Sequence, residues 1–328
     1  MAISITGMRP TGTPHLGNYL GMLRPALALA REHEALCFIA DLHALIDVRD
    51  PGALRAHTRE IGAVWLAFGL DPQRTVLYRQ SAAPEVCEVV WLVSCVTAKG
   101  TLNRAHAYKA LLEANRRAGR DPDAGVSAGL FGYPLLMAAD ILAMGAEIVP
   151  VGRDQRQHVE VAREIARAFN AAYGDVLRVP EAVVDERVMT VPGLDGRKMS
   201  KSYGNVIPLM AEPDELRRCV MRIVTDSRPP EEPKDPVGDT IFELYRELAP
   251  DDAVLRLRER YLAGGLGYGE AKQGLFEVLE EVMRAPRARY RELMADPGEL
   301  ERVLAAGGEV ARARADATLR RMREAVGL

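Results

Sequence analysis

Short apolar runs that alternate with helix-length segments constrain the fold of this chain more than any other feature of its sequence. The apolar runs cover 2–6, 35–40, 75–79 and 147–151. Helical periodicity fills the intervening segments 16–30, 52–68, 85–98 and 157–172. This alternation predicts an α/β fold whose sheet is parallel, doubly wound and Rossmann-like.

The pattern changes after Pro208, where strand-like runs stop and helical patterns take over. These patterns cover 213–225, 241–248, 270–283 and 287–294. Because 328 residues exceed the usual size of one hydrophobic core, we expect a second, all-helical domain. The expected units are a Rossmann-like domain (1–190), a loop and linker (191–207), a helical domain (208–312) and a C-terminal helix that packs back towards the first domain (313–328). The buried stripe expected near the C-terminus consists of Leu304, Val310, Leu319, Met322 and Val326.

Composition excludes some classes of protein. A net charge of −3 argues against an extensively basic surface, so any nucleic-acid contact must come from local patches. The four cysteines have spacings that match no zinc or iron–sulfur pattern, and we interpret them as buried thiols. There is no apolar stretch of about 18 residues and no secretory or transit pattern at the N-terminus, which predicts a cytoplasmic protein without a membrane span.

The first predicted strand leads through a turn-rich loop, 7–14, into the motif His15-Leu16-Gly17-Asn18. Unpaired backbone N–H groups at the start of a helix attract phosphate, and the imidazole of His15 adds a donor. Gly17 allows a nucleotide to approach the backbone, and Asn18 donates to phosphate without a titrating group. Taken alone, this motif is explained equally well by a capping or core histidine.

A second motif, Lys198-Met199-Ser200-Lys201-Ser202, follows a glycine-rich break about 180 residues later. Two ammonium groups on one short loop can close on a triphosphate and stabilise charge that moves onto pyrophosphate. A solvated charge run explains an isolated lysine pair equally well. The occurrence of both motifs in one chain favours a site that holds ATP and activates a carboxylate with it.

The two motifs match the HIGH-like and KMSKS signatures, so the chain resembles the class I aminoacyl-tRNA synthetases. Segments 7–12, 133–142 and 149–155 are similar to bacterial tryptophanyl-tRNA synthetases, and the resemblance runs nearly end to end. It implies activation of L-tryptophan by ATP with Mg²⁺ and transfer to tRNA(Trp), with 208–312 as the anticodon-binding domain. It also implies a homodimer, with 85–98 as a candidate interface helix, and no protein-bound zinc or iron–sulfur cluster.

The resemblance implies a tryptophan pocket. Asp140 matches the aspartate that accepts the indole N–H, and Met137 matches the methionine that packs on the ring. A structural carboxylate and a core methionine are the alternatives for these two residues. Tyr133 and Gln155 match residues that hold the α-amino group. The other expected pocket residues are Ile5, Gly7, His43 and Val151. A structural histidine explains His43 equally well.

The resemblance also implies the ATP site. His15, Asn18, Lys198 and Lys201 are the expected catalytic residues. The expected ATP-binding residues are Arg9, Thr11, Gly17, Asn18, Gly152, Asp154, Val191, Lys198, Met199, Ser200, Lys201 and Ser202. Asp154 matches a ribose-binding carboxylate, and a helix cap is its alternative. The chain departs from the common pattern at Arg9, Arg153 and Leu111, whereas Lys109 keeps a basic position that reaches the ATP phosphates.

Three other functions remain open at this point. A tyrosine-specific synthetase is disfavoured because Ile5 and Met137 are apolar where that enzyme has phenol-reading residues. A nucleotidyltransferase that does not use tRNA conflicts with the helical region, and a catalytically silent paralogue conflicts with the intact lysine motif.

Arg217, Arg218 and Arg222 are candidates for tRNA phosphate contacts. We interpret the arginines of the last helix as a solvated face.

Overall fold

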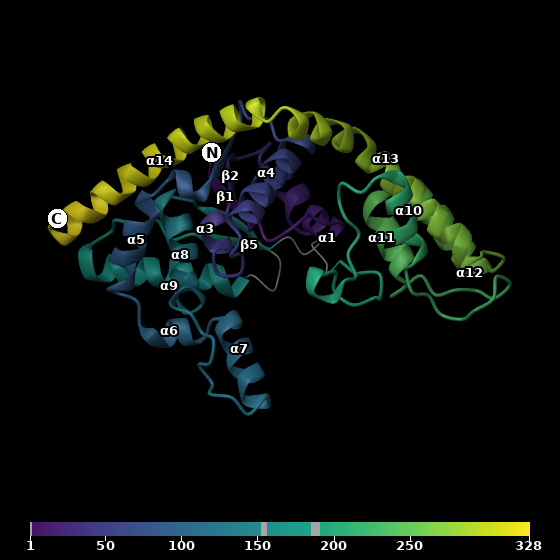
Figure 1. The fold of residues 1–328 in the computed structure, drawn as a ribbon, viewed down its shortest axis with the longest axis horizontal. Helices are drawn as coiled ribbons and strands as arrows, with labels where there is room; N and C mark the ends of the chain where they lie inside the picture. The colour runs from purple at the N-terminus through teal and green to yellow at the C-terminus, as the bar shows by residue number, and fades with distance from the viewer. Residues whose placement is uncertain (1, 152–155, 185–190) are drawn as a thin grey trace.

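A five-stranded parallel sheet organises the larger part of the molecule in the computed structural model, which describes residues 2–151, 156–184 and 191–328 (Figure 1). The strands are β1 (Ile3–Met8), β2 (Glu34–Ile39), β3 (Thr75–Arg79), β4 (Ile148–Val151) and β5 (Glu181–Val184), in the order β3-β2-β1-β4-β5. The predicted parallel sheet is confirmed, and β5 is an addition. Because the strand order changes direction at β1, the carboxyl end of β1 is the expected place for a ligand.

Alternating side chains of the strands feed two hydrophobic clusters on opposite faces of the sheet. Cys37 and Ile39 of β2 belong to one cluster, whereas Leu36 and Phe38 belong to the other. The first cluster contains α4 (Pro51–Ala67) and continues into the helical region. The second contains α5 (Glu85–Ser94), α8 (Ala128–Ala143) and α9 (Arg156–Tyr173).

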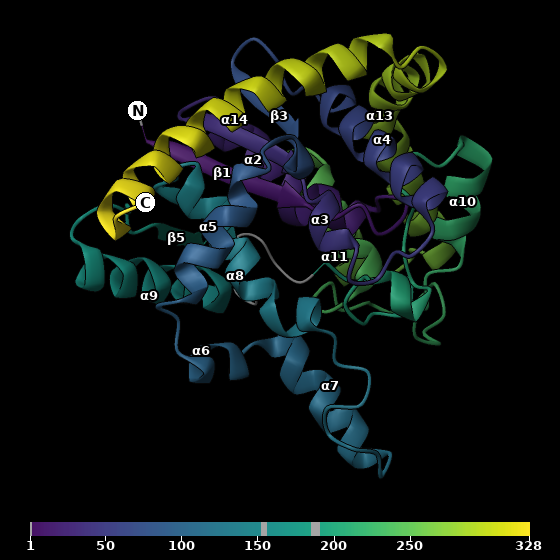
Figure 2. The same ribbon diagram turned by 60° about the vertical axis from the view of Figure 1, so that its left-hand side comes forward.

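Two segments around the sheet differ in detail from the prediction. The helix expected over 16–30 consists of α1 (Leu16–Asn18), a π-helical turn (Tyr19–Leu23) and α2 (Arg24–Leu29). A short helix, α3 (Asp41–Ala44), follows β2, and a 3₁₀ turn (Gln80–Ala82) follows β3. Beyond α6 (Lys99–Asn103), α7 (His106–Arg117) projects away from the sheet (Figure 2).

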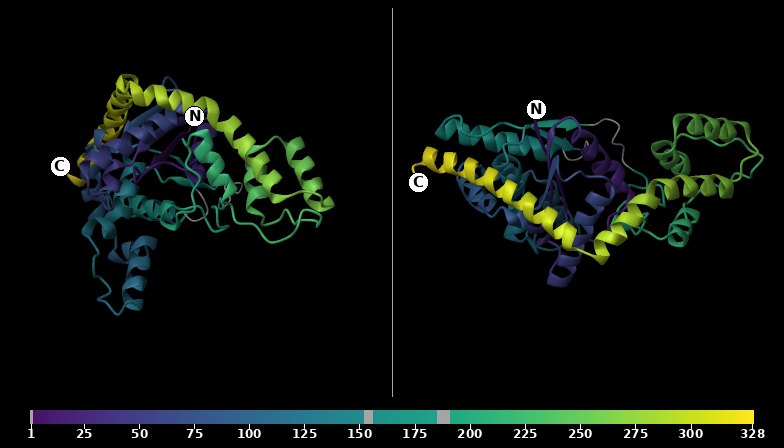
Figure 3. Two further views of the ribbon diagram at one scale, coloured as in Figure 1. Left: turned by 45° about the vertical axis from the view of Figure 1, so that its right-hand side comes forward. Right: turned by 90° about the horizontal axis from the view of Figure 1, so that it is seen from above.

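The region after residue 208 is helical throughout its regular elements, as predicted. It contains α10 (Pro213–Met221), α11 (Thr240–Leu248), α12 (Asp251–Ala263) and α13 (Tyr268–Ala295), which group to one side of the sheet (Figure 3). The two helices expected over 270–283 and 287–294 are one helix, because α13 continues through Pro286. Helix α12 was not predicted.

A single long helix, α14 (Gly298–Val326), runs from the helical region across the outer side of the sheet (Figure 1). The expected division between 312 and 313 falls inside this helix. Its backbone approaches β3 so closely that a Cβ on Gly307 would lie 2.0 Å from the carbonyl oxygen of Leu77. Arg79 of β3 binds Glu301 at 2.6 Å. The helix therefore covers the edge strand of the sheet.

Two predictions about burial are wrong. Leu304, Leu319 and Met322 of α14 are buried and Val326 is half-buried, but Val310 is 43% exposed and lies outside the stripe. Only Cys37 is a fully buried thiol. Cys87 and Cys95 are exposed and Cys219 is half-buried. Among the described residues, we find no helix both long and apolar enough to cross a membrane.

Candidate active site

The two sequence motifs lie in direct contact at the carboxyl end of β1. Leu16 N–H donates to the Ile207 carbonyl at 2.9 Å, and Leu209 N–H donates to the Pro14 carbonyl at 3.0 Å. Gly17 N–H lies 3.3 Å from the Met199 sulfur, which is buried against α1. Residues separated by about 180 positions in the chain therefore form one site, as the motif interpretation requires.

His15 and Lys201 form the electrostatic centre of this contact. Burial and, to a smaller extent, the charge of Lys201 lower the pKa of His15 to about 4, so the imidazole is neutral at pH 7. Burial also lowers the pKa of Lys201, and the charge of Glu60 opposes this shift. Within the described part of the chain, His15 Nδ1 is buried without a hydrogen-bond partner. A cation beside an unsatisfied neutral ring suits an anionic ligand.

Close contacts with Lys201 and His15 explain why Gly12 and Gly17 carry no side chain. An added Cβ on Gly12 would lie 3.3 Å from Lys201 Nζ, and Gly12 has a φ of +125°. An added Cβ on Gly17 would lie 3.0 Å from His15 Nδ1. Asn18 closes the start of α1 by accepting the His15 N–H at 3.0 Å, which leaves its amide group as a donor. The loop after β1 is therefore shaped around the lysine and the histidine.

The lysine motif has a defined backbone. Met199 N–H donates to the Val191 carbonyl at 2.8 Å, and the Ser200 and Ser202 hydroxyl groups lie 2.9 Å apart. A 3₁₀ turn begins at Lys201. Sequence reasoning expected an irregular loop and missed Asn205, a buried residue whose amide side chain binds the backbone of the motif.

A second polar centre lies around Asp140 on α8, which is 3% exposed. Its carboxylate binds His43 Nε2 at 3.0 Å and accepts Gln80 Nε2–H at 2.8 Å on each oxygen. Burial raises the pKa of the Asp140 carboxyl, and the bonds from His43 and Gln80 oppose that shift. The structure thus brings together His43 and Asp140, and their roles in a tryptophan pocket stay predictions.

Gln80 is the residue of this centre that the sequence did not reveal. Its Oε1 accepts the Leu42 N–H at 3.1 Å, while its amide nitrogen donates to Asp140. It follows β3, just as Asp41 and His43 follow β2. Polar residues directly after a parallel strand are the pattern that would have drawn attention to it.

Other predicted tryptophan-pocket residues have mixed positions. Ile5 is buried in β1, and Met137 is half-buried. Gly7 is exposed, and a Cβ added to it would lie 2.3 Å from a ring atom of Phe38. The Tyr133 hydroxyl lies 2.9 Å from His158 Nε2, a partner that the sequence did not suggest. Gly152, Arg153, Asp154 and Gln155, as well as the Val151 side chain, lie outside the described residues.

The remaining predicted ATP contacts lie on the surface. Arg9 is exposed and pairs with Asp47, and Thr11 N–H donates to the Arg9 carbonyl at 2.9 Å. Lys109 is exposed on the projecting helix α7, where Leu111 is half-buried.

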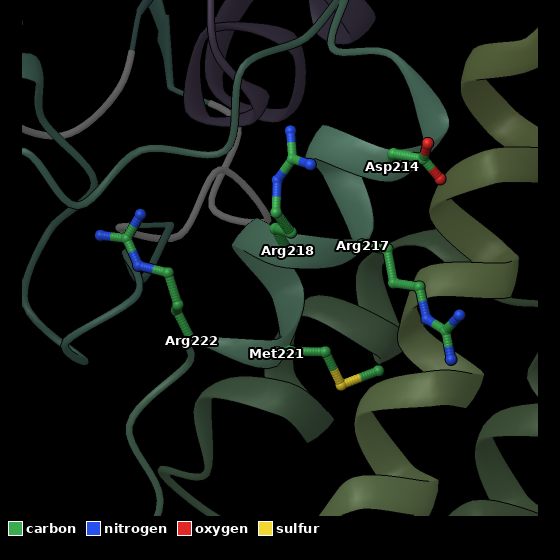
Figure 4. Close-up of a pocket in the computed structure, with 5 residues that line it drawn as sticks. All are labelled: Asp214, Arg217, Arg218, Met221 and Arg222. Carbon is green, nitrogen blue, oxygen red and sulfur yellow. The ribbon is translucent and has the colours of Figure 1, made fainter.

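An open hollow on α10 is lined by Asp214, Arg217, Arg218, Met221 and Arg222 (Figure 4). Arg218 and Arg222 extend on the side of α10 away from α13, and Arg217 extends towards α13. We find no ion pair for these three arginines among the described residues. The arginines of α14 differ, because Arg312 binds Glu85 and Arg323 binds Glu88.

Comparisons with known proteins agree with this geometry. A sequence model of the tRNA synthetases class I (W and Y) matches residues 2–284. The chain belongs to this family. The tryptophan–tRNA ligase of Xanthomonas campestris is 52% identical over 99% of the chain and 76% of that relative. The tryptophan–tRNA ligase of Pseudomonas aeruginosa is 51% identical over 99% of the chain and 73% of the relative.

A solved structure of the same family has the same fold. The tryptophanyl-tRNA synthetase of Campylobacter jejuni, complexed with ADP and tryptophan, is 38% identical with a TM-score of 0.88. The match covers 99% of the chain and all of that structure. Membership of the class I synthetases agrees with the contact between the two signature motifs at the carboxyl end of β1.

Proposed function

We propose that the chain is a tryptophan–tRNA ligase, which converts L-tryptophan and ATP into tryptophanyl-adenylate and pyrophosphate and then charges tRNA(Trp). The observation that carries the substrate is the buried Asp140 carboxylate. A charged acceptor for the single indole N–H contributes roughly 1.5–3 kcal/mol, and an amino acid without that donor loses this bond. Two relatives that are more than half identical along nearly all of this chain carry the same name.

The first step is attack of the tryptophan carboxylate on the α-phosphorus of ATP. The carboxylate is already a nucleophile, so the protein supplies alignment and charge stabilisation in place of a general base. His15 is neutral and serves as a hydrogen-bonding group on the phosphates. Lys198 and Lys201 stabilise the negative charge that collects on pyrophosphate as the bond between the α- and β-phosphates breaks.

Magnesium enters as part of the MgATP substrate. The described motif residues offer imidazole, amide, hydroxyl and ammonium groups, which can donate hydrogen bonds to phosphate oxygens. No group of three or more histidine, cysteine or acidic residues within the described ranges is arranged to hold a metal ion. The ATP contacts proposed for Gly152 and Asp154 stay predictions, as does that for Val191.

Exchange of labelled pyrophosphate into ATP tests the substrate. We expect exchange with tryptophan and none above background with tyrosine, because Ile5 and Met137 supply apolar walls and no phenol partner. Exchange with tyrosine alone would replace this proposal by the sister enzyme. Charging of purified tRNA(Trp) tests the second step. Strong exchange with no charging would favour a nucleotidyltransferase that does not use tRNA.

We further propose that the helical region 208–312 binds the anticodon part of tRNA through the arginines of α10, for which the described residues provide no ion pair. In a double variant, Arg218→Glu with Arg222→Glu, pyrophosphate exchange should persist while tRNA affinity falls. The slope of log affinity against log salt should decrease by roughly 0.7–0.9 per lost phosphate contact. Arg320→Glu is the control for the reversal of one arginine, compared per substituted residue, because Arg320 is already paired with Asp316 on α14. Equal slopes for both variants would move the tRNA site elsewhere.

A homodimer through α5 is part of the proposal. Trp91 is 69% exposed, and Cys87 and Cys95 lie one turn before and after it on the same side of the helix. Trp91→Glu should shift the sedimentation coefficient from that of a dimer to that of a monomer. An unchanged coefficient would remove α5 from the interface. The cytoplasmic location stays a prediction.

A further inference from the structure

Asn205 lies in the turn after the lysine motif, is 3% exposed, and uses both ends of its amide group. Its Oδ1 accepts the Ser200 N–H at 2.8 Å. Its Nδ2 donates to Asp195 Oδ1 at 2.6 Å and to the Lys198 carbonyl at 3.1 Å. One side chain therefore holds the backbone at two positions of the five-residue motif.

The segment before the motif packs against both the backbone and the side chain of Asn205. Leu194 N–H donates to the backbone carbonyl of Asn205 at 2.9 Å. A Cβ added to Gly193 would lie 2.3 Å from Asn205 Nδ2, so the chain passes this residue only because Gly193 has no side chain. The bonds on both sides fix where Lys198 and Lys201 leave the backbone.

The same segment is joined to the helical region. The Leu194 carbonyl accepts the Val224 N–H at 2.8 Å, just beyond the end of α10. Asn205 and Val224 therefore bind the two sides of one residue, Leu194. Backbone hydrogen bonds through Leu194 therefore join the end of α10 to the turn that follows the lysine motif.

We propose that Asn205 is a positioning residue for adenylate formation. Its side chain holds the backbone from which Lys198 and Lys201 reach the departing pyrophosphate, and its backbone carbonyl joins that loop to Leu194. The proposal rests on the proposed function, because it assigns the lysines to the pyrophosphate. The Asn205 side chain binds Asp195 and the backbone of Lys198 and Ser200, so it acts through the lysines.

The variant Asn205→Ala removes all side-chain bonds to the motif. We expect the kcat of tryptophan-dependent exchange to fall roughly 100-fold, as for other small displacements of charged groups. The KM for tryptophan should stay within about twofold, because Asp140, His43 and Gln80 do not contact this loop. Hydrogen exchange at residues 198–205 should accelerate, since the Ser200 N–H loses its acceptor.

The variant Asn205→Asp tests the chemistry at constant size. It places a carboxylate 2.6 Å from the Asp195 carboxylate and removes the donor to Lys198, so kcat should fall at least as far as with alanine. Adding Asp195→Asn puts an amide donor opposite the new carboxylate. This double variant should recover part of the lost kcat, because the bond between positions 195 and 205 is restored.

Asn170→Ala is the matched control. Asn170 also binds two sides of a loop, since it accepts the Leu177 N–H at 2.9 Å and donates to the Leu177 carbonyl at 2.8 Å, but it lies at the far end of α9. Its kcat should match that of the unchanged protein. The proposal is overturned if Asn205→Ala keeps kcat within twofold, if its loss equals that of Asn170→Ala, or if the double variant recovers nothing. Exchange by the unchanged protein shows separately whether the proposed function holds.

Discussion

The ATP end and the tryptophan end of the site are built on opposite principles. At the ATP end, a neutral histidine lies beside a partly buried lysine, and its buried Nδ1 has no hydrogen-bond partner among residues 2–151, 156–184 and 191–328. At the tryptophan end, the carboxylate of Asp140 is buried and bound on both oxygens by His43 and Gln80. The groups of the first end are free to bind a polyanion, as far as the described residues show. The carboxylate of the second end already has protein donors on both oxygens.

This difference predicts where each end is sensitive. An unsatisfied cationic site acts mainly on the transition state, since charge moves onto pyrophosphate only during the reaction. A satisfied carboxylate acts on recognition, because its bonds are set before the substrate arrives. Substitutions at the ATP end should therefore change kcat, and those at the tryptophan end should change the KM for tryptophan.

The largest effect is expected from Lys201→Ala. Loss of one charge-stabilising group should lower the kcat of pyrophosphate exchange roughly 10²–10³-fold. The KM for tryptophan should not change, and steady-state exchange kinetics at varied tryptophan provide the measurement. If the variant raised only the KM for tryptophan, Lys201 would not act on the pyrophosphate. The expected difference between the two ends of the site would then be wrong.

A smaller effect is expected from Asp140→Ala. Loss of a charged acceptor for one N–H corresponds to roughly 1.5–3 kcal/mol, or about 10- to 150-fold in kcat/KM for tryptophan. ATP binding, measured by equilibrium dialysis without tryptophan, should stay the same. If tryptophan KM were unchanged, Asp140 would be a structural carboxylate, which was the alternative interpretation of the sequence.

The smallest effect concerns His15 and pH. The pKa of the His15 imidazole is about 4 in the folded chain and near 6.5 in the unfolded chain. Between these two pH values, the unfolded state binds a proton on His15 and the folded state does not. The free energy of unfolding should therefore decrease by about 2 kcal/mol between pH 7 and pH 5 from this residue. Urea unfolding at both pH values should show a shallower decrease for His15→Gln. Parallel curves would mean that His15 titrates normally.

The sequence predicted the sheet because four of its strands are apolar runs between periodic helices. It missed β5, a four-residue strand that begins with the charged Glu181 and leaves only three apolar residues in a row. It missed α12 because Tyr261 is the one buried side chain in that helix, so no apolar stripe marks it. It divided α13 at Pro286, where packing on both flanks keeps the helix continuous although proline removes a backbone donor.

Site residues that belong to short contiguous motifs were predictable from the sequence. Residues whose role depends on tertiary contacts were less predictable. His15 and Lys201 were found because their neighbours in the chain form signatures. Gln80 and Asn205 have no such neighbours. Gln80 acquires its role only when the end of β3 meets α8, and Asn205 only when the chain turns back on the lysine motif. Amide side chains serve many structural roles, so residue type alone does not distinguish these two.

The long helix α14 sets the order in which this molecule can be completed during synthesis. Arg79 on the edge strand and its partner Glu301 are 222 residues apart in the chain. A ribosome that adds 5–20 residues per second needs roughly 10–45 s to make that interval. Throughout this time the outer edge of the nascent sheet stays open to other chains. The rate of translation through the helical region therefore sets how long the newborn protein is exposed to misassembly.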